Sequence, residues 1–164
     1  MKYTTFMIAI CLGFLLMAQR ANAQDYKWAA GLKFGGYESG FSGKYFIESN
    51  RALEGIIGFR RQGVVVTGLY EIHQTAFKVE NLKFYYGFGA HFGSIGRGEN
   101  KFFFNEDRKY YDARLLAGAD GVLGLEYLIP KSPIAVSLDL NPRVELATGP
   151  NFDLAPGLGI KYTF

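Results

Sequence analysis

The feature that most constrains this chain is a strict two-residue alternation of apolar and polar side chains. In residues 82–93 one face is continuously apolar and consists of Leu82, Phe84, Tyr86, Phe88, Ala90 and Phe92. Successive side chains of a β-strand point to opposite faces, so this pattern predicts a strand with two chemically different faces. Residues 114–129, 134–146 and 153–164 repeat it. No stretch after residue 24 sustains a helical period, and we expect an all-β chain.

The N-terminal half follows the same pattern with interruptions. Residues 28–36, 41–48, 52–60 and 64–73 read as four further strands. The Ser49-Asn50 pair predicts a hairpin turn between the second and third of them. Leu69 is an exception, since it falls on the polar face of 64–73. In total the alternation predicts eight strands.

The first residues predict export. Lys2 precedes an apolar run over 6–18, and the small-x-small triplet Ala21-Asn22-Ala23 follows. This order is typical of a secretory signal peptide, so we expect 1–23 to be cleaved and 24–164 to form one domain. The run is too short to cross about 30 Å of hydrocarbon as a helix. The sequence has one cysteine, Cys11, and it lies in the cleaved segment.

The two faces of the strands indicate what surrounds the sheet. A soluble lipocalin-like barrel keeps its apolar face inside, around a ligand. Here the apolar face carries no charge in the four clearest segments, and strands of this length match a lipid-exposed wall. Because the backbone must be satisfied internally in lipid, such a sheet must close. We therefore predict an all-β, eight-stranded, antiparallel up-and-down transmembrane β-barrel; a soluble ligand-binding barrel is the alternative.

The opposite face carries charges of both signs in near balance. The residues predicted to point inward are Lys33, Glu54, Arg60, Glu71, His73, Lys83, His91, Arg114, Asp120, Glu126, Asp139, Asn141, Arg143, Glu145, Asp153 and Lys161. An eight-stranded barrel is only wide enough to be filled by side chains, and buried charges must be paired. We interpret this face as a hydrogen-bonded, ion-paired core. A narrow conduit for ions or small solutes is the alternative.

Aromatic residues support the same topology. If both termini are periplasmic, one aromatic girdle falls near the periplasmic rim and consists of Trp28, Tyr45, Tyr70, Phe84, Tyr86, Tyr127, Tyr162 and Phe164. A second falls near the external rim and consists of Phe34, Phe41, Phe59 and Phe92. Amphipathic rings prefer the headgroup level, so two girdles are expected of a membrane barrel.

The two histidines offer little for catalysis. His73 shares the inward face with Glu71 near the periplasmic end, whereas His91 lies near the outer end of the next strand. At opposite heights they should not join one metal site or a catalytic dyad. His91 with Ser94 is the pair closest to a lipid-modifying hydrolase or acyltransferase, without an evident third group. We expect no enzyme activity, metal or cofactor, with a lipid-A-type enzyme as the minor alternative.

The longest connection, 94–112, falls on the external side and contains Phe102, Phe103 and Phe104 between charges of both signs. It predicts a solvated hairpin beyond the bilayer, or a protruding edge that recruits an extracellular protein or surface ligand through these phenylalanines. The net charge of +3 is spread without a basic block, so no nucleic acid is expected as a partner.

The last residues carry a resemblance to a known family. Gly159, Tyr162 and Phe164 resemble the C-terminal signal of outer-membrane barrels, in which an aromatic follows a glycine by three residues and a terminal aromatic ends the chain. The whole of 24–164 resembles the small barrels of the OmpX and OmpA-transmembrane-domain type, and 52–59 and 85–89 resemble a further set of such barrels. The resemblance implies the outer membrane of a Gram-negative cell, the lipid bilayer and the barrel-assembly machinery as partners. Members of this fold act variously as adhesins, enzymes and narrow channels. We expect a structural or surface-interacting role without a wide pore.

Overall fold

The computed structural model describes residues 26–36, 38–60, 63–96, 98–100, 108–110 and 112–164. The predicted signal segment 1–23 and the three phenylalanines Phe102, Phe103 and Phe104 lie outside the described residues. The strands are β1 (Trp28–Gly35), β2 (Ser39–Glu48), β3 (Arg51–Arg60), β4 (Gly63–Thr75), β5 (Leu82–Ile95), β6 (Gly98–Asn100), β7 (Arg108–Tyr110), β8 (Arg114–Leu128), β9 (Ile134–Glu145) and β10 (Asn151–Thr163). Within these ranges, no helix is long and apolar enough to cross a membrane.

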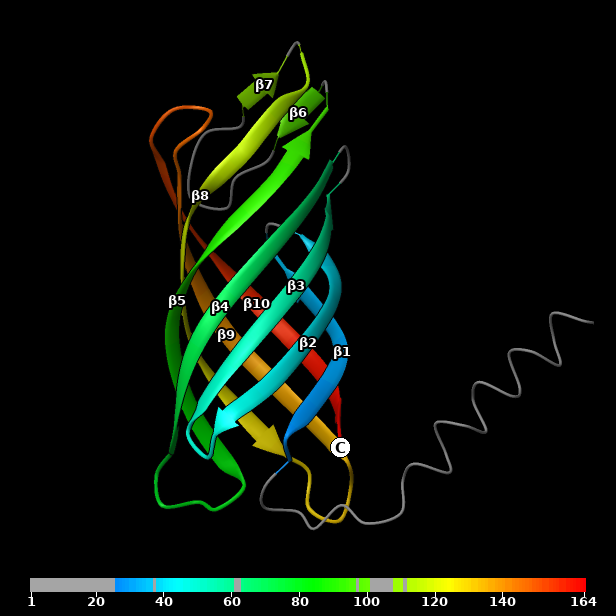
Figure 1. Cartoon of the computed structure of the whole chain (residues 1–164), viewed down its shortest axis with the longest axis vertical. Helices are drawn as coiled ribbons and strands as arrows, with labels where there is room; N and C mark the ends of the chain where they lie inside the picture. The colour runs from blue at the N-terminus through cyan, green and yellow to red at the C-terminus, as the bar shows by residue number, and fades with distance from the viewer. Residues whose placement is uncertain (1–25, 37, 61–62, 97, 101–107, 111) are drawn as a thin grey trace, which may run out of the picture.

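Eight of the strands form one closed barrel in the order β1-β10-β9-β8-β5-β4-β3-β2, with antiparallel neighbours throughout (Figure 1). The first and last strands close it, with Ala29 opposite Thr163 and Gly35 opposite Gly157. The predicted eight-stranded antiparallel barrel is confirmed. Two short strands, β6 and β7, pair with each other outside the barrel wall, within the connection between β5 and β8 for which the sequence predicted a hairpin.

The two ends of the barrel differ. The end where β1 begins and the C-terminus lies is here called the terminal end; the opposite end, above which β6 and β7 pair, is the hairpin end (Figure 1). Strands β4 and β5 remain paired to Gly63 and Ile95, beyond the expected limits at residues 64 and 93. Backbone pairing continues there although the alternation of side chains fades, because ladder hydrogen bonds do not depend on side-chain polarity.

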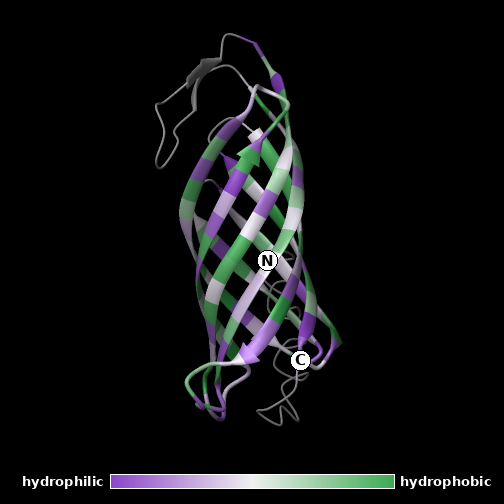
Figure 2. Cartoon of the chain, turned by 90° about the vertical axis from the view of Figure 1, so that its left-hand side faces the viewer, coloured by the Kyte–Doolittle hydropathy of each residue, from purple (hydrophilic) through white to green (hydrophobic). Residues whose placement is uncertain are grey.

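The apolar face of the wall points outward and the charged face inward. Phe88 is 67% exposed and Leu138 62%, whereas Asp139 is 2% and Arg143 7% exposed. Figure 2 shows the resulting alternation of hydrophobic and hydrophilic residues along the strands. The side chains that in a water-soluble protein would form the core therefore cover the outside of this barrel.

The interior also contains two small apolar clusters. Leu69 is buried there with Ile56, Tyr85 and Val122, which explains why it interrupts the polar face of its strand. Val65, Ile95 and Leu116 form the second cluster, reaching the last residue of β5 at the hairpin end. Between these apolar clusters the interior is polar.

Candidate functional site

The polar interior at the terminal end is centred on Lys44 of β2. Its ammonium lies 2.9 Å from Glu71 of β4, 3.0 Å from Glu126 of β8 and 3.4 Å from Glu54 of β3. The Lys44 side chain is fully enclosed. Lys44 was not among the residues predicted to point inward. The alternation did indicate an inward Lys44, because Lys44 lies on the face opposite Tyr45. However, the apolar Phe46 shares the face of Lys44, so this face of the strand is not consistently polar.

Further pairs extend this cluster across the barrel. Lys161 of β10 lies 3.0 Å from Glu54, and the Ser42 hydroxyl donates to Glu54 at 2.5 Å. On the same level Lys33 lies 3.2 Å from Asp139, which also accepts a 2.6 Å hydrogen bond from the Tyr85 hydroxyl. We call this set the terminal cluster; it comprises Lys33, Lys44, Glu54, Glu71, Glu126, Asp139 and Lys161.

His73 borders the terminal cluster between two aromatic rings. It stacks on Tyr85 with a centroid distance of 5.1 Å and an interplanar angle of 14°, and its ring centroid is 4.8 Å from that of Phe46. Its Nε2 atom is 3.0 Å from Glu71. Its Nδ1 atom is buried and has no hydrogen-bond partner among the described residues. The Lys44 ammonium lies 4.6 Å above the centre of the Tyr85 ring.

A second polar cluster lies nearer the hairpin end and is centred on Arg143. Its guanidinium contacts Asp120 at 2.5 Å, Thr67 at 3.2 Å, and Glu38 at 2.9 and 3.1 Å. Glu38 also accepts a 3.0 Å hydrogen bond from Arg60. It lies between β1 and β2, outside every strand, and was not predicted as an interior residue. Burial alone would raise the pKa of Glu38, but the two guanidinium groups outweigh burial and lower it below its ordinary value.

We call the second set the hairpin cluster; it comprises Glu38, Arg60, Thr67, His91, Asp120, Arg143 and Glu145. Within it, His91 lies between two carboxylates. Its Nδ1 atom is 2.7 Å from Asp120 and its Nε2 atom 3.0 Å from Glu145. Glu145 also accepts hydrogen bonds from the backbone of Ala117 and Ala147. The expectation that His91 lacks an orienting group was therefore wrong. Ser94 is exposed whereas His91 is buried, so the two side chains considered as a catalytic pair do not share a face of β5.

Among the predicted interior residues, Arg114 is wrongly placed, since it is exposed. It is the first residue of β8 and pairs with Ile95 of β5, whereas pairing of β8 with β9 starts only at Gly118. Residues 114–117 of β8 are therefore in register with β5 alone. The side chain of Arg114 thus lies at the open rim and is not enclosed by the barrel wall.

The other predicted interior residues are less central. Lys83 is half-buried at the terminal end, with its ammonium 3.5 Å from the Thr75 hydroxyl. Asn141 is half-buried and donates to Asp139 at 2.5 Å. Asp153 is buried and accepts a hydrogen bond from the backbone of Leu154. Within the described part of the chain, no three His, Cys, Asp or Glu side chains form a candidate metal site.

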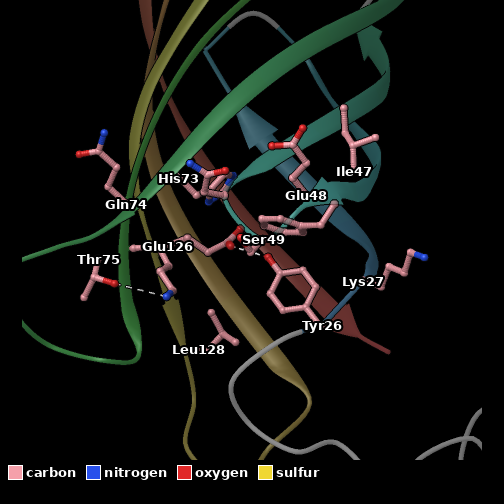
Figure 3. Close-up of a pocket in the computed structure, with 13 residues that line it drawn as sticks. Tyr26, Lys27, Ile47, Glu48, Ser49, His73, Gln74, Thr75, Glu126 and Leu128 are labelled. Atoms are coloured by element: carbon pink, nitrogen blue, oxygen red, sulfur yellow. Dashed lines mark hydrogen bonds between the residues drawn. The ribbon is translucent and has the colours of Figure 1, made fainter.

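A cavity of about 550 Å³ opens into the terminal end beside the terminal cluster (Figure 3). We call it the vestibule; its lining includes Tyr26, Phe46, His73, Thr75, Lys83 and Leu128. The Tyr26 hydroxyl donates to Glu126 at 2.5 Å, and the ring packs edge-on against Phe46 at 5.0 Å. Burial, and then the negative charge of Glu126, raise the pKa of Tyr26 far above its ordinary value. Sequence reasoning did not find Tyr26, because it precedes the first strand.

A solved structure has this architecture too. The N-terminal β-barrel domain of Pseudomonas aeruginosa OprF superposes with a TM-score of 0.58, covering 84% of this chain and 95% of that domain at 18% sequence identity. The two chains have the same fold. No protein-family model matches the chain, and no curated protein matches it.

The predicted interface aromatics lie on the outer surface. Trp28, Tyr86, Phe92, Tyr127 and Phe164 are exposed, and the half-buried members are Tyr45, Tyr70, Phe84 and Tyr162. Several contact one another: Trp28 and Tyr45 lie 4.3 Å apart between ring centroids, and Tyr162 and Phe164 lie 6.2 Å apart.

The residues of the C-terminal motif face both sides of β10. Gly159 points inward and is buried, and a Cβ atom there would collide with the Ser137 hydroxyl. Tyr162 and Phe164 point outward, with Phe164 at the end of the chain paired to Trp28 through two backbone hydrogen bonds. The motif thus belongs to the strand that closes the barrel.

Proposed function

We propose that this chain is an integral outer-membrane β-barrel protein of a Gram-negative bacterium, exported through cleavage of residues 1–23. The observation that carries the proposal is the combination of a closed barrel with an exposed apolar wall and buried charges. Large apolar side chains are exposed on every one of the eight barrel strands, among them Leu32, Phe41, Ile57, Val66, Phe88, Leu123, Leu138 and Ile160. Contiguous apolar surface of this extent is unfavourable in water and favourable in hydrocarbon.

The dimensions support the same conclusion. The barrel strands run from 8 residues in β1 to 15 in β8, and a tilted strand needs about 9–11 residues to cross a bilayer. Exposed aromatic residues Trp28, Tyr127 and Phe164 lie near strand ends on the terminal side, where headgroups would surround them. We infer that the terminal end lies in the periplasm and the hairpin end outside the cell.

The role that fits this architecture is structural or surface-interacting. The terminal and hairpin clusters fill the lumen with paired charges, which argues against a wide pore and against catalysis in the interior. Contacts with an extracellular protein or surface ligand would use the connections at the hairpin end, above all 94–112 with Phe102–Phe104. Gly159, Tyr162 and Phe164 would be read by the barrel-assembly machinery during insertion.

Cell fractionation combined with gel migration tests the location. We expect the protein in the outer-membrane fraction, soluble only in detergent, and migrating differently before and after boiling because a closed barrel stays folded in the unheated sample. Recovery from the periplasm without detergent would instead indicate a soluble barrel.

Two further measurements test the role. Purified protein in a planar bilayer should give a flat current trace, and steady openings would identify a narrow channel. Mass spectra of membrane lipid from cells with and without the protein should be identical, and a new or missing acyl chain would identify a lipid-modifying enzyme.

A further inference from the structure

The two longer connections at the terminal end each hold a lysine in a left-handed backbone conformation. Lys78 lies in the β4–β5 connection and Lys131 in the β8–β9 connection, and φ is 61° at both. Figure 1 shows both connections at this end of the barrel. Glycine or asparagine adopts such a φ at lower cost. The geometry of the turns alone therefore does not account for lysine at these two positions.

Exposed apolar side chains flank each of these lysines. Phe77 is 82% exposed and Val79 45%, on either side of the first lysine in the sequence. Ile129 and Ile134 are exposed on either side of the turn that holds the second, and they continue the outward faces of β8 and β9. Both turns thus place a cation directly beside apolar surface, a combination that suits the boundary between hydrocarbon and water.

A third cation lies on the same rim, beside the outward-facing rings at the start of β1. The ammonium of Lys27 is 5.7 Å from the centre of the Tyr45 ring, and that ring is 4.3 Å from the Trp28 ring between centroids. Trp28 is 51% exposed. We call Lys27, Lys78 and Lys131 the basic collar.

The carboxylates of this rim do not neutralise the basic collar. None of its three ammonium groups forms an ion pair with another described residue. Glu48 contacts Arg51 at 3.3 Å, and Glu80 is the other exposed carboxylate side chain in the described part of the terminal end. Exposed lysine and arginine side chains therefore outnumber exposed carboxylate side chains there, and the rim favours an anionic partner.

We propose that the basic collar binds the phosphate groups of anionic phospholipids in the leaflet that surrounds the terminal end. The proposal rests on the membrane location proposed above. The three ammonium groups contact the lipid phosphates, while the apolar side chains beside them lie against the upper acyl chains. Phosphatidylglycerol fits this surface better than phosphatidylcholine, because the quaternary ammonium of phosphatidylcholine would face the lysines. A lysine near an anionic lipid surface strengthens association by about fivefold.

Quenching of tryptophan fluorescence by brominated phospholipids tests the proposal. Trp28 is the one tryptophan of the chain and follows Lys27 directly. It is also close to the β8–β9 connection, since its backbone pairs with Phe164 while the N–H of Thr163 donates to the carbonyl of Pro133. In phosphatidylcholine vesicles, brominated phosphatidylglycerol should associate with this site about fivefold more strongly than brominated phosphatidylcholine. In 1 M salt the preference should disappear, because the Debye length falls to about 3 Å.

Charge-removing variants locate the effect. The double variant Lys27→Gln, Lys131→Gln should lower the relative association constant at Trp28 to about one. Arg114→Gln is the control, since it removes one exposed cation at the hairpin end and should keep the preference of the parent. Heat-dependent gel migration verifies that each variant is folded.

A second probe reports on the β4–β5 connection. Phe77→Trp in a Trp28→Phe background places the indole directly beside Lys78. Brominated phosphatidylglycerol should again be preferred about fivefold, and Lys78→Gln should abolish this preference.

The outcomes separate this proposal from the membrane location on which it rests. Equal association constants for the two lipids, or a preference that survives in the folded lysine variants, would overturn the basic collar as a lipid site and leave the membrane location intact. Loss of the preference in Arg114→Gln would show an effect of net charge and would equally overturn it. An absence of quenching by either brominated lipid would contradict the membrane location itself, and the lipid site with it.

Discussion

The guanidinium of Arg143 holds both carboxylate oxygens of Glu38, with Nη2 2.9 Å from Oε1 and Nη1 3.1 Å from Oε2, although 105 positions separate the two residues. The pair ties the β1–β2 connection to β9 across the hairpin end of the lumen. Bidentate geometry is the strongest arrangement available to an arginine and a carboxylate. A residue outside the strands thus completes the interior.

Replacing Glu38 with Gln should destabilise the protein by about 1.5–3 kcal/mol, because it removes the carboxylate that two buried guanidinium groups share, while Arg143 keeps its contact with Asp120. Urea unfolding in lipid vesicles at pH 7 measures the difference. Glu80→Gln is the control, since Glu80 is exposed in the β4–β5 connection. A Glu38→Gln protein as stable as the parent would show that the pair contributes nothing.

The same pair predicts a pH dependence. The pKa of Glu38 is lower in the folded chain than its ordinary value of 4.5, so its stabilising contribution is present above pH 4.5 and is lost as the pH falls through the folded-state pKa. The difference in free energy of unfolding between the parent and Glu38→Gln should therefore shrink below pH 4.5. A difference that stays constant from pH 7 to pH 3 would contradict this assignment.

Lys44→Met should be among the most damaging single substitutions. It leaves Glu54, Glu71 and Glu126 facing one another without the ammonium that all three contact, at a cost of about 3–5 kcal/mol. Unfolding followed by the fluorescence of Trp28 measures the loss. Lys78→Met, at an exposed turn position, should change the free energy of unfolding by less than about 0.5 kcal/mol. Equal effects of the two variants would argue against a central role for Lys44.

Gly124→Ala tests how tightly the interior is packed around Tyr85. A Cβ atom at position 124 would lie 2.6 Å from Cζ of Tyr85 and 2.7 Å from Cβ of Asp139. Overpacking of this kind costs about 1–3 kcal/mol. Gly55→Ala is the matched control, because nothing lies within 4 Å of a Cβ atom there. If both variants unfold at the same urea concentration, the ring of Tyr85 is not held as described.

Leu138→Arg tests which solvent surrounds the wall. Leu138 is exposed in the middle of β9, and in lipid an arginine there should cost about 2–4 kcal/mol, falling to about 0–1 kcal/mol near the interface. Leu146→Arg, one residue beyond the end of β9, provides the interfacial comparison in the same vesicles. If the two arginines are equally tolerated, the wall around Leu138 does not face hydrocarbon.

The sequence contains enough information to predict the wall but not the contacts inside it. Alternation is a local property of each strand, so the number of strands and the outward position of Leu138 follow from residues two apart. Which side chains meet across the lumen depends on strand tilt and shear, which no single segment specifies. Lys44 could have been found from its face, whereas Glu38 and Tyr26 lie outside the strands and reach the interior only once the barrel has closed. Arg114 has inward periodicity, but its strand begins above the closed wall.

The seam between β1 and β10 has a consequence for biogenesis. Ala29 cannot pair with Thr163 until β10 has been synthesised, so the barrel cannot close before that strand is available. Until then two rows of backbone amide and carbonyl groups remain open, and such unpaired edges can pair with those of other copies of the chain. A chain that lost its last few residues would therefore present unpaired edges and become a substrate for proteolysis, instead of forming a slightly weaker version of the same barrel.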